Sequence, residues 1–250
     1  LGSSGFWISD AMAEKAHEAG CQLLSPSSAI ALHLENSIRG HAPELLTHEC
    51  VSRILDDLKE KSPSLVEEFV RDRVKPRQLQ KVLQDLLLEG VSIRDTETIL
   101  ESTGSSFSEN LKYEKVLAEV RRSLSRALSS SRLETDGQLH AIILAPELEN
   151  LVESRIIETV DGEMLSLEAM EREQIRAHTS EKLTELRAAG HKSVVLCRSE
   201  IRRHLWKLLG TRVPGLSVLA YEEIGEDIKV ELHGTVDKVM VPLNSEALQE

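Results

Sequence analysis

The sequence predicts an α+β protein of several subdomains, with a helical bundle in the middle, a small α/β sandwich after it and the end of a further α/β subdomain at the N-terminus. Three observations favour this fold class. Helical periodicity with short connections continues from residue 41 to 128, and continuous apolar runs of strand length recur after residue 138. The opening stretch, residues 6–40, is too short to bury a core of its own.

The opening stretch carries the signals of two helices. Asp10 can cap a first helix that ends at Gly20, and Pro26 can begin a second helix that ends at Gly40. The apolar segment 21–24 between them is consistent with a strand. The first five residues resemble a remnant of recombinant expression and are set aside.

Helix-start signals recur through the bundle. Thr47, Pro63 and Pro76 each precede or open an amphipathic helix. The helix after Pro76 has the clearest pattern, with apolar residues at i, i+3, i+4, i+7 and i+8, so we expect these positions to be core: Leu79, Val82, Leu83, Leu86 and Leu87.

The bundle is predicted to end with two further helices. Asp95 caps a short helix that runs to Leu100, and the serine- and glycine-rich segment 102–108 reads as a loop. A last amphipathic helix then runs from Tyr113 to Leu128.

The C-terminal part alternates between strands and helices. Its apolar runs and amphipathic segments predict strands at 139–145, 193–197 and 216–220, helices at 146–157, 167–186 and 199–209, and a last strand with one wet face through Ile228, Val230 and Leu232. The predicted organisation is an expression remnant (1–5), the end of subdomain 1 (6–40), a helical subdomain 3 (41–128), a linker (129–137), an α/β subdomain 4 (138–242) and a tail (243–250).

Composition excludes several classes of function. The net charge is −12 and the pI is about 5.3, so the mean field would repel nucleic acids and anionic membranes, and we expect no nucleic-acid partner. The three cysteines are odd in number and widely spaced, which is typical of a reducing compartment. No apolar run approaches the roughly 20 residues needed to span a bilayer.

The motifs of catalysis and cofactor binding are not found. The sequence has no phosphate-binding glycine loop and no nucleophile elbow. None of the nine histidines forms a His-x-x-x-His pair, and the trio His48-Glu49-Cys50 points in three directions on a helix. We therefore expect no catalytic residues, no cofactor, no metal site and no enzymatic activity.

Charge is unevenly distributed over the C-terminal part. Residues 147–173 hold nine acidic residues against two arginines, a net charge of −7, whereas residues 191–212 carry a net charge of +5. Two faces of opposite sign suit a contact with a charged partner protein, and they suit pairing within the subdomain equally well.

One ordered string of the sequence carries a family resemblance. It consists of Pro43–Thr47, Pro63–Glu68 and Leu79–Glu101, and weaker similarity flanks it at Phe6–Ile8, Ala29–Leu34 and Leu216–Ile224. This string resembles the cytoplasmic domain of the FlhA/SctV (FHIPEP) export-gate family of type III secretion systems. The resemblance covers residues 6–242, and it does not separate the flagellar branch from the injectisome branch, where the family serves virulence.

The resemblance implies an architecture and a role. Family members place a membrane portion before a cytoplasmic domain of four subdomains, and this chain would hold the end of subdomain 1 with subdomains 3 and 4. They assemble as a homo-nonameric ring at the bacterial inner membrane, with this domain facing the cytoplasm. The ring docks export chaperones with their cargo and other apparatus proteins during protein export. Contact with the membrane would be made only through the N-terminal part that is missing here.

The resemblance also implies candidate site residues. We expect ring contacts at Gln80, Gln84, Arg94 and Asp95, with helix capping as the competing role of Asp95. For chaperone and cargo docking the matching positions are Trp7, Leu32 and His33. Leu32 departs from the family, which has threonine there, and Trp7 is also interpreted as an anchor that packs the subdomain.

Two other classes of function remain open from the sequence. A monomeric regulatory adaptor would use the acidic face formed by residues 146–173 to bind a basic partner protein. A small α/β hydrolase or transferase would need a pocket in which polar groups converge.

Overall fold

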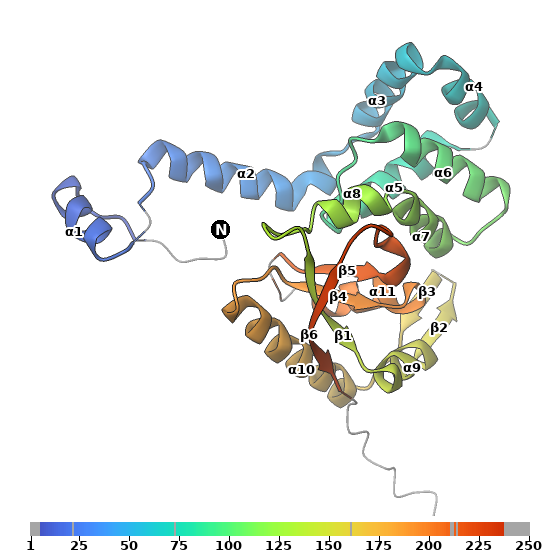
Figure 1. Ribbon diagram of the computed structural model, residues 1–250. Helices are drawn as coiled ribbons and strands as arrows, with labels where there is room; N and C mark the ends of the chain where they lie inside the picture. Colours follow the sequence, from blue (N-terminus) through green and yellow to red (C-terminus); the bar gives the residue numbers. More distant parts are fainter. Residues whose placement is uncertain are drawn as a thin grey trace, which may run out of the picture.

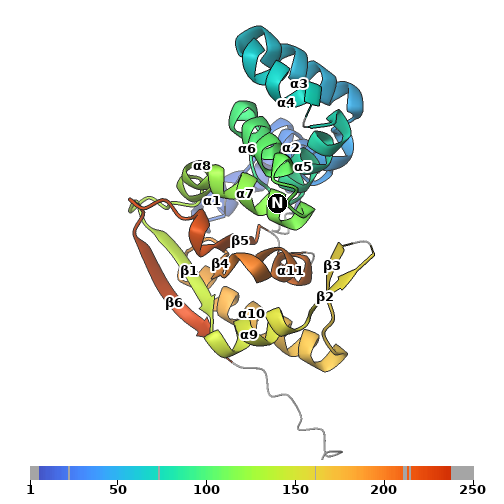
Figure 2. The same ribbon diagram turned by 90° about the vertical axis from the view of Figure 1, so that its right-hand side faces the viewer.

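The structure, a computed structural model, describes residues 6–21, 23–72, 74–160, 162–210, 213 and 215–237. Three parts follow one another along the chain (Figure 1). An N-terminal arm projects from the body, a helical bundle follows it, and an α/β unit packs beneath the bundle (Figures 1 and 2). This arrangement confirms the predicted fold class.

The arm consists of a 3-10 helix η1 (Asp10–Met12), α1 (Ala13–Glu18) and α2 (Pro26–Leu45). The predicted strand at 21–24 is wrong, because its described residues form no strand. The predicted helix end at Gly40 is also wrong, since α2 continues to Leu45 with Pro43 inside it. Gly40 keeps a helical backbone, and α2 ends without a glycine turn. Its Pro43 carbonyl accepts from Gln84 of another helix, and its Ala42 and Leu45 carbonyls accept from the backbone N–H groups of residues 46 and 47.

The bundle contains six helices within the described residues: α3 (His48–Lys61), α4 (Pro63–Asp72), α5 (Pro76–Leu88), α6 (Thr96–Ser108), α7 (Tyr113–Ser123) and α8 (Ser125–Ser130). Thr47 caps α3, because its hydroxyl accepts a hydrogen bond from the Cys50 backbone N–H at 3.3 Å. The expected core positions of α5 are confirmed except Leu87, which is half-buried.

Helix α6 overturns the loop that was predicted for residues 102–108. The helix runs on to Ser108 because its small residues let α4 approach closely. A Cβ atom added at Gly104 would lie 2.0 Å from Cδ1 of Phe69, so only glycine fits there. The last predicted helix is likewise interrupted, since α7 ends at Ser123 and α8 begins at Ser125. The end of α8 also occupies Ser129 and Ser130, the start of the predicted linker.

The α/β unit contains a four-stranded parallel sheet in the order β5-β4-β1-β6. Its elements are β1 (Leu139–Leu144), α9 (Pro146–Ser154), β2 (Ile156–Thr159), β3 (Gly162–Leu165), α10 (Ala169–Ala188), β4 (Val194–Cys197), α11 (Ser199–Leu209), β5 (Ser217–Ala220), the 3-10 helix η2 (Tyr221–Glu223) and β6 (Val230–Val236). The three apolar runs are confirmed as strands: every residue of β4 and β5 is buried, and so is every residue of β1 except Ile143.

The antiparallel hairpin β2–β3 was not predicted. Helix α9 ends at Ser154 instead of residue 157, because Ile156 already pairs with Leu165 of β3. The hairpin stands beside α11 at the edge of the α/β unit (Figure 2). Among the described residues, no helix combines the length and the apolar character needed to cross a bilayer.

Candidate functional site

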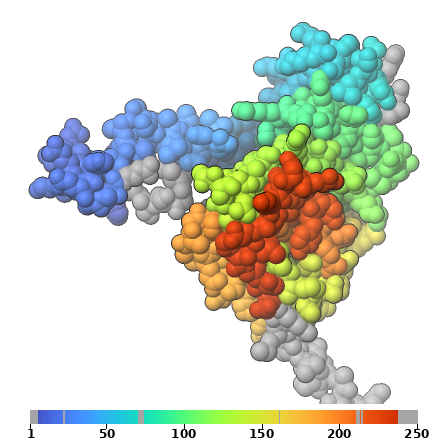
Figure 3. Space-filling model, viewed as in Figure 1, coloured from blue at the N-terminus to red at the C-terminus, as the bar shows by residue number. Residues whose placement is uncertain are grey.

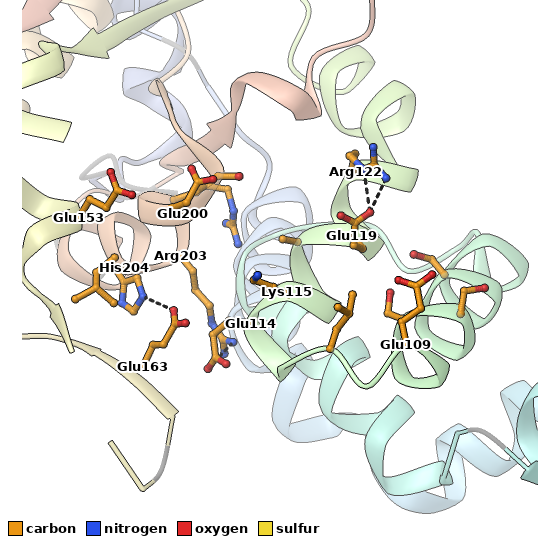
Figure 4. A pocket seen from close by; sticks show the side chains of 18 residues that line it. Glu109, Glu114, Lys115, Glu119, Arg122, Glu153, Glu163, Glu200, Arg203 and His204 are labelled. Atoms are coloured by element: carbon orange, nitrogen blue, oxygen red, sulfur yellow. Dashed lines mark hydrogen bonds and ion pairs between the residues drawn. The ribbon is translucent and has the colours of Figure 1, made fainter. Parts of the chain in front are cut away.

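A cleft separates the bundle from the α/β unit. Helices α6 and α7 form one wall, and α11 with the β2–β3 hairpin forms the other (Figure 4). Its volume is about 890 Å³, within the range of ligand and peptide pockets. Both walls are polar, and side chains of opposite walls point into the space between them.

The cleft is acidic. Its lining includes six glutamates, namely Glu109, Glu114, Glu119, Glu153, Glu163 and Glu200, against four cationic side chains, namely Lys115, Arg122, Arg202 and Arg203. Arg202 and Arg203 are paired with acidic residues that lie outside the lining, Glu89 and Asp85. Three of the lining glutamates are also near cations, since Glu119 pairs with Arg122, Glu153 pairs with Arg198 and Glu114 lies 3.9 Å from Arg203. Glu109, Glu163 and Glu200 remain against Lys115, so the electrostatic potential of the cleft is negative, which favours a cationic occupant.

The geometry does not assemble a nucleophile and a base. The Nε2 atom of His204 lies 3.5 Å from a carboxylate oxygen of Glu163, and burial lowers the pKa of His204 more than Glu163 raises it. Four serines also line the cleft, and within the described residues none of them forms a hydrogen bond with this imidazole. A hydrolase with a serine nucleophile and a histidine base needs such a contact.

Buried charges join the two walls behind the cleft. Arg121 of α7 donates from Nε and Nη2 to both carboxylate oxygens of Glu223 of η2, at 2.6 and 2.7 Å, and from Nη1 to Glu89 at 2.8 Å. Arg202 of α11 also pairs with Glu89, and its Nε lies 3.4 Å from Glu223. All four side chains are at most 3 % exposed. The alternating charges fix the bundle to the α/β unit.

A second contact between the two parts lies nearer the surface. Asp85 of α5 accepts hydrogen bonds from the Tyr113 hydroxyl at 2.7 Å and from Nη2 of Arg203 at 2.6 Å. The guanidinium of Arg203 also lies over the Tyr113 ring, 5.3 Å from its centroid. Burial, together with the nearby Asp85 carboxylate, raises the pKa of Tyr113, so this hydroxyl stays protonated as a donor.

Much of the positive stretch 191–212 is used internally. Arg198 pairs with Glu149 and Glu153 of α9, at 3.1 and 2.9 Å. Arg202 and Arg203 point into the contact with the bundle. The structure therefore favours pairing within the protein over an exposed basic face. Asp161 and Arg212, which contribute to the two predicted faces, lie outside the described residues.

The predicted ring-contact residues lie along α5 and the turn that follows it. Gln80 donates to the Leu46 carbonyl at 2.9 Å, and Gln84 donates to the carbonyls of Pro43 and Leu46 at 3.0 and 3.1 Å. Asp95 caps α6 through a 3.2 Å bond from the Thr98 N–H, and Arg94 is exposed. The capping role of Asp95 is confirmed.

The predicted docking residues lie on the arm, away from the cleft. Trp7 is 78 % exposed, so it anchors nothing within the part of the chain that the structure describes. Leu32 is half-buried on α2 and His33 is exposed beside it.

Sequence reasoning missed the buried charge network. One signal was present, because Arg121 occupies a core position of α7 in register with Leu117 and Leu124. A charge at such a position needs a buried partner. The identity of the partners, Glu89 and Glu223, depends on tertiary packing and had no local signal.

Comparison with known proteins identifies the family. The model of the FHIPEP family matches residues 1–229. The chain belongs to the FHIPEP family. Among its relatives, the flagellar biosynthesis protein FlhA of Treponema pallidum is 30 % identical over 239 residues, which is 94 % of this chain and 34 % of that protein. The chain thus spans about a third of the length of the curated relatives it matches.

Two solved structures share this fold. The Chlamydia pneumoniae CdsV protein, solved in a complex with CdsO, superposes with a TM-score of 0.81 at 26 % identity and covers 92 % of this chain and 67 % of that one. The nonameric EscV cytosolic domain from the type III secretion system gives a TM-score of 0.76 at 25 % identity, over 89 % of this chain and 66 % of that one. The FHIPEP fold is thus shared over nearly the whole chain.

Proposed function

We propose that this chain is a cytosolic part of a type III secretion export gate, where it forms a subunit of a ring and docks chaperones with their cargo and other apparatus proteins. Membership of the FHIPEP family supports the export role. In this proposal the protein resides at the bacterial inner membrane, through a portion that the chain does not span.

The observation that carries the ring is the match to a nonameric relative. The EscV cytosolic domain shares the fold over 89 % of this chain, and it assembles as a nonamer. An exposed apolar face on the arm also favours assembly. None of the residues of α2, all of which the structure describes, is buried, and Ile30, Leu34 and Ile38 are 49–65 % exposed on one face. The arm stands clear of the body (Figure 3). An unpartnered apolar face of this kind is typical of a protein contact.

Two surfaces are proposed for partner proteins. The acidic cleft suits a basic segment of an apparatus protein, and the complex of CdsV with CdsO supports partner binding by this fold. For chaperone and cargo docking we keep Trp7, Leu32 and His33 on the arm, where exposure of Trp7 leaves an aromatic side chain ready for contact.

The ring contact is proposed at Arg94 and Asp95, with Gln80 and Gln84 beside them. Assembly is tested with the chain tethered by its N-terminus to a lipid monolayer, which raises its effective concentration as an anchor would. Electron-microscopic class averages are expected to show ninefold rings. The Arg94→Ala variant is expected to need at least about fivefold higher surface density, because one lost contact of about 1 kcal/mol corresponds to that factor.

The matched control is Lys59→Ala, which removes another exposed cation, from α3. If Arg94→Ala forms rings at the same surface density as Lys59→Ala, the face that carries Arg94 is not part of the ring contact. A wild-type chain that stays monomeric at every density would overturn the ring itself.

Docking is tested by titrating the chain with an export chaperone loaded with cargo and with the chaperone alone, using surface plasmon resonance. Trp7→Ala is expected to weaken binding of the loaded chaperone by 10-fold or more, as for an aromatic hot spot. The control is Met12→Ala, another exposed apolar residue of the arm. Equal binding by both variants would exclude Trp7 from the docking site.

A second candidate function rests on the acidic cleft. A monomeric adaptor that binds a basic segment needs the cleft but no ring. A Glu109→Lys/Glu200→Lys variant would abolish binding of a basic peptide whether the chain acts as a ring subunit or as a monomeric adaptor. If a variant that forms no rings still restores protein export in cells, the adaptor function is favoured.

A further inference from the structure

Three histidines from distant parts of the chain meet at one end of the parallel sheet. His140 lies in β1, His191 follows α10 and His233 lies in β6. One imidazole nitrogen of each lies within 4.8 Å of the other two. The ring centroids of His140 and His191 are 3.9 Å apart, and that of His233 is 4.5 Å from His191 and 5.0 Å from His140.

Backbone irregularities aim two of these side chains. In the pairing of β1 with β6, Ala141 faces Leu232 and Ile142 faces Gly234, so His233 is the extra residue of a β-bulge. A bulge redirects its side chain, and bulges are enriched next to functional sites. Gly190, with φ of +93°, ends the turn after α10 and places His191 against the sheet.

Carboxylates orient the two inner rings. The Nε2 atom of His140 lies 2.7 Å from Asp136, and the Nδ1 atom of His191 lies 3.0 Å from Glu134. A carboxylate accepts, so these nitrogens carry the protons, and the opposite nitrogen of each ring is left as a lone-pair donor. Carboxylate–histidine pairs of this kind are the usual outer partners of metal-binding histidines.

The lone pair of His140 is already engaged at the centre of the cluster. Its Nδ1 accepts a hydrogen bond from Nε2 of His233 at 2.7 Å. The carboxylate of Glu231 lies 3.7 Å from the same Nδ1 and 4.0 Å from Nε2 of His233. Three imidazole nitrogens thus lie around one point, with the Glu231 carboxylate beside two of them. Glu134, Asp136 and Glu231 supply negative charge for a cation.

We propose that His140, His191 and His233 bind a zinc ion, with Glu231 as the fourth ligand. Imidazole nitrogens bind Zn²⁺ at about 2.0–2.1 Å in a tetrahedral arrangement, so ligand atoms around the ion lie about 3.3 Å apart. Movements of about 1–2 Å reach this geometry from the present spacing, as the stacked pair opens and His233 changes tautomer. Its proton moves from Nε2 to Nδ1 of the same ring, so that the lone pairs of His233 Nε2 and His140 Nδ1 are both free for the ion. The proposal departs from the sequence expectation of no metal site, which rested on local spacing alone.

A short segment joins the bundle to the α/β unit, and the ion would link this segment to the sheet. Glu134 and Asp136 belong to this segment, and Glu134 also accepts from the Lys192 backbone N–H at 2.8 Å. The Lys192 ammonium in turn donates to the Leu133 carbonyl at 2.8 Å. Zinc binding should therefore stabilise the α/β unit and the entry to β1 together.

The test uses tag-free, chelator-treated chain in which Cys21 and Cys50 are replaced by serine, so that thiols do not compete. Isothermal titration with Zn²⁺ and the visible spectrum of bound Co²⁺ are measured. We expect one Zn²⁺ per chain with a Kd of about 1 µM or tighter, a tetrahedral Co²⁺ spectrum, and no saturable response to Mg²⁺.

The deciding variants are His233→Ala and His191→Ala, which change partly exposed positions and spare the buried His140. Each is expected to weaken Zn²⁺ binding by about 100-fold or more, and Asp136→Asn by about 10- to 100-fold. The matched control is His178→Ala, an exposed histidine of α10. Circular dichroism verifies folding of each variant. Unchanged Zn²⁺ affinity in the cluster variants, or no stoichiometric binding by the parent, would overturn the proposal.

Discussion

At the scale of the residue, Gly104 decides how closely α4 and α6 can pack. Its neighbours in α6 are small, and Thr103 and Ser106 are buried with it. The side chain of Phe69 lies where a Cβ atom of residue 104 would stand, with three ring atoms within 2.8 Å of that point. One added methyl group must therefore push the two helices apart.

The Gly104→Ala variant is expected to lower the free energy of unfolding by about 1–3 kcal/mol, because overpacking forces the Phe69 ring from its place. The measurement is equilibrium urea unfolding followed by circular dichroism. The matched control is Gly40→Ala in α2, where nothing lies within 4 Å of the added atom. There alanine should be neutral or raise helix stability by about 0.5–1 kcal/mol. A rise in the free energy of unfolding for alanine at both positions would contradict the close approach of α4 to α6.

The same residues explain why the loop prediction for 102–108 was wrong. Serine and glycine are typical of loops when the chain is considered locally. Phe69, which makes small residues necessary, lies far earlier in the sequence. The histidine cluster was equally invisible, because His140, His191 and His233 are brought together only by the β1–β6 pairing and the turn after α10.

At the scale of the element, α2 is oriented by its C-terminal end. The side chains of Gln80 and Gln84 on α5 donate to carbonyls at and just beyond the last turn of α2. These amides act as a cap from outside the helix. The sequence showed helix periodicity in both α2 and α5. It gave no sign that α2 would run past Gly40 and end where two glutamines of α5 contact it.

The Gln84→Ala variant removes two of these hydrogen bonds. We expect a loss of about 1 kcal/mol of stability and faster hydrogen exchange over residues 42–47, because the Pro43 carbonyl loses its side-chain partner and the Leu46 carbonyl keeps only Gln80. Hydrogen–deuterium exchange with mass spectrometry gives the measurement. Arg77→Ala, at an exposed position of the same helix, is the control and should leave exchange over these residues unchanged. Equal exchange in both variants would mean that α2 is held by other contacts.

At the scale of the whole molecule, four buried charges join the bundle to the α/β unit. Glu89 and Arg121 come from the bundle, and Arg202 and Glu223 come from the other part. Removal of one member leaves an unpaired charge in a dry contact, which is far more costly than loss of a surface pair. The two parts should therefore unfold as one cooperative unit.

The Glu89→Gln variant is expected to lose about 3–5 kcal/mol of stability, because Arg202 then loses its close carboxylate and two buried guanidinium groups share Glu223 alone. Differential scanning calorimetry should resolve two transitions where the wild type shows one. The control, Glu119→Gln, breaks an exposed pair with Arg122 and should cost less than about 1 kcal/mol. A single transition with a small loss in Glu89→Gln would show that the network does not couple the two parts.

Acid should weaken this coupling in a definite direction. Burial opposes ionisation of Glu89, but Arg202 and Arg121 outweigh it and hold the pKa of this carboxyl below its ordinary value of 4.5. A depressed pKa gives stability that is complete above about pH 4.5 and is lost as the pH falls through the lower folded value.

The corresponding measurement is the urea midpoint at a series of pH values from 7 down to 3. Wild type should lose stability below about pH 4.5, by up to about 1.4 kcal/mol per pH unit from this one group. Glu89→Gln should show a shallower slope over the same interval. Parallel slopes would contradict the assignment of this acid sensitivity to Glu89.

Much of the fold could be predicted because it rests on local periodicity. The pattern of Leu79, Val82, Leu83 and Leu86 and the apolar runs of β1, β4 and β5 specify burial directly. The hairpin β2–β3 could not be predicted, since none of its residues is buried and its contact with the bundle is made by distant partners such as Lys112, whose ammonium lies 2.6 Å from Glu158. The cleft likewise arises only from the docking of two parts.

The outward course of α2 has a mechanical consequence. A helix of 20 residues is about 30 Å long, so a tilt of about 10° at its fixed end moves the far end by about 5 Å. Any such rotation of the helix has its pivot at Leu46, which is held by Gln80 and Gln84. A small disturbance of two amide side chains would be magnified into a large swing of whatever the helix carries at Pro26.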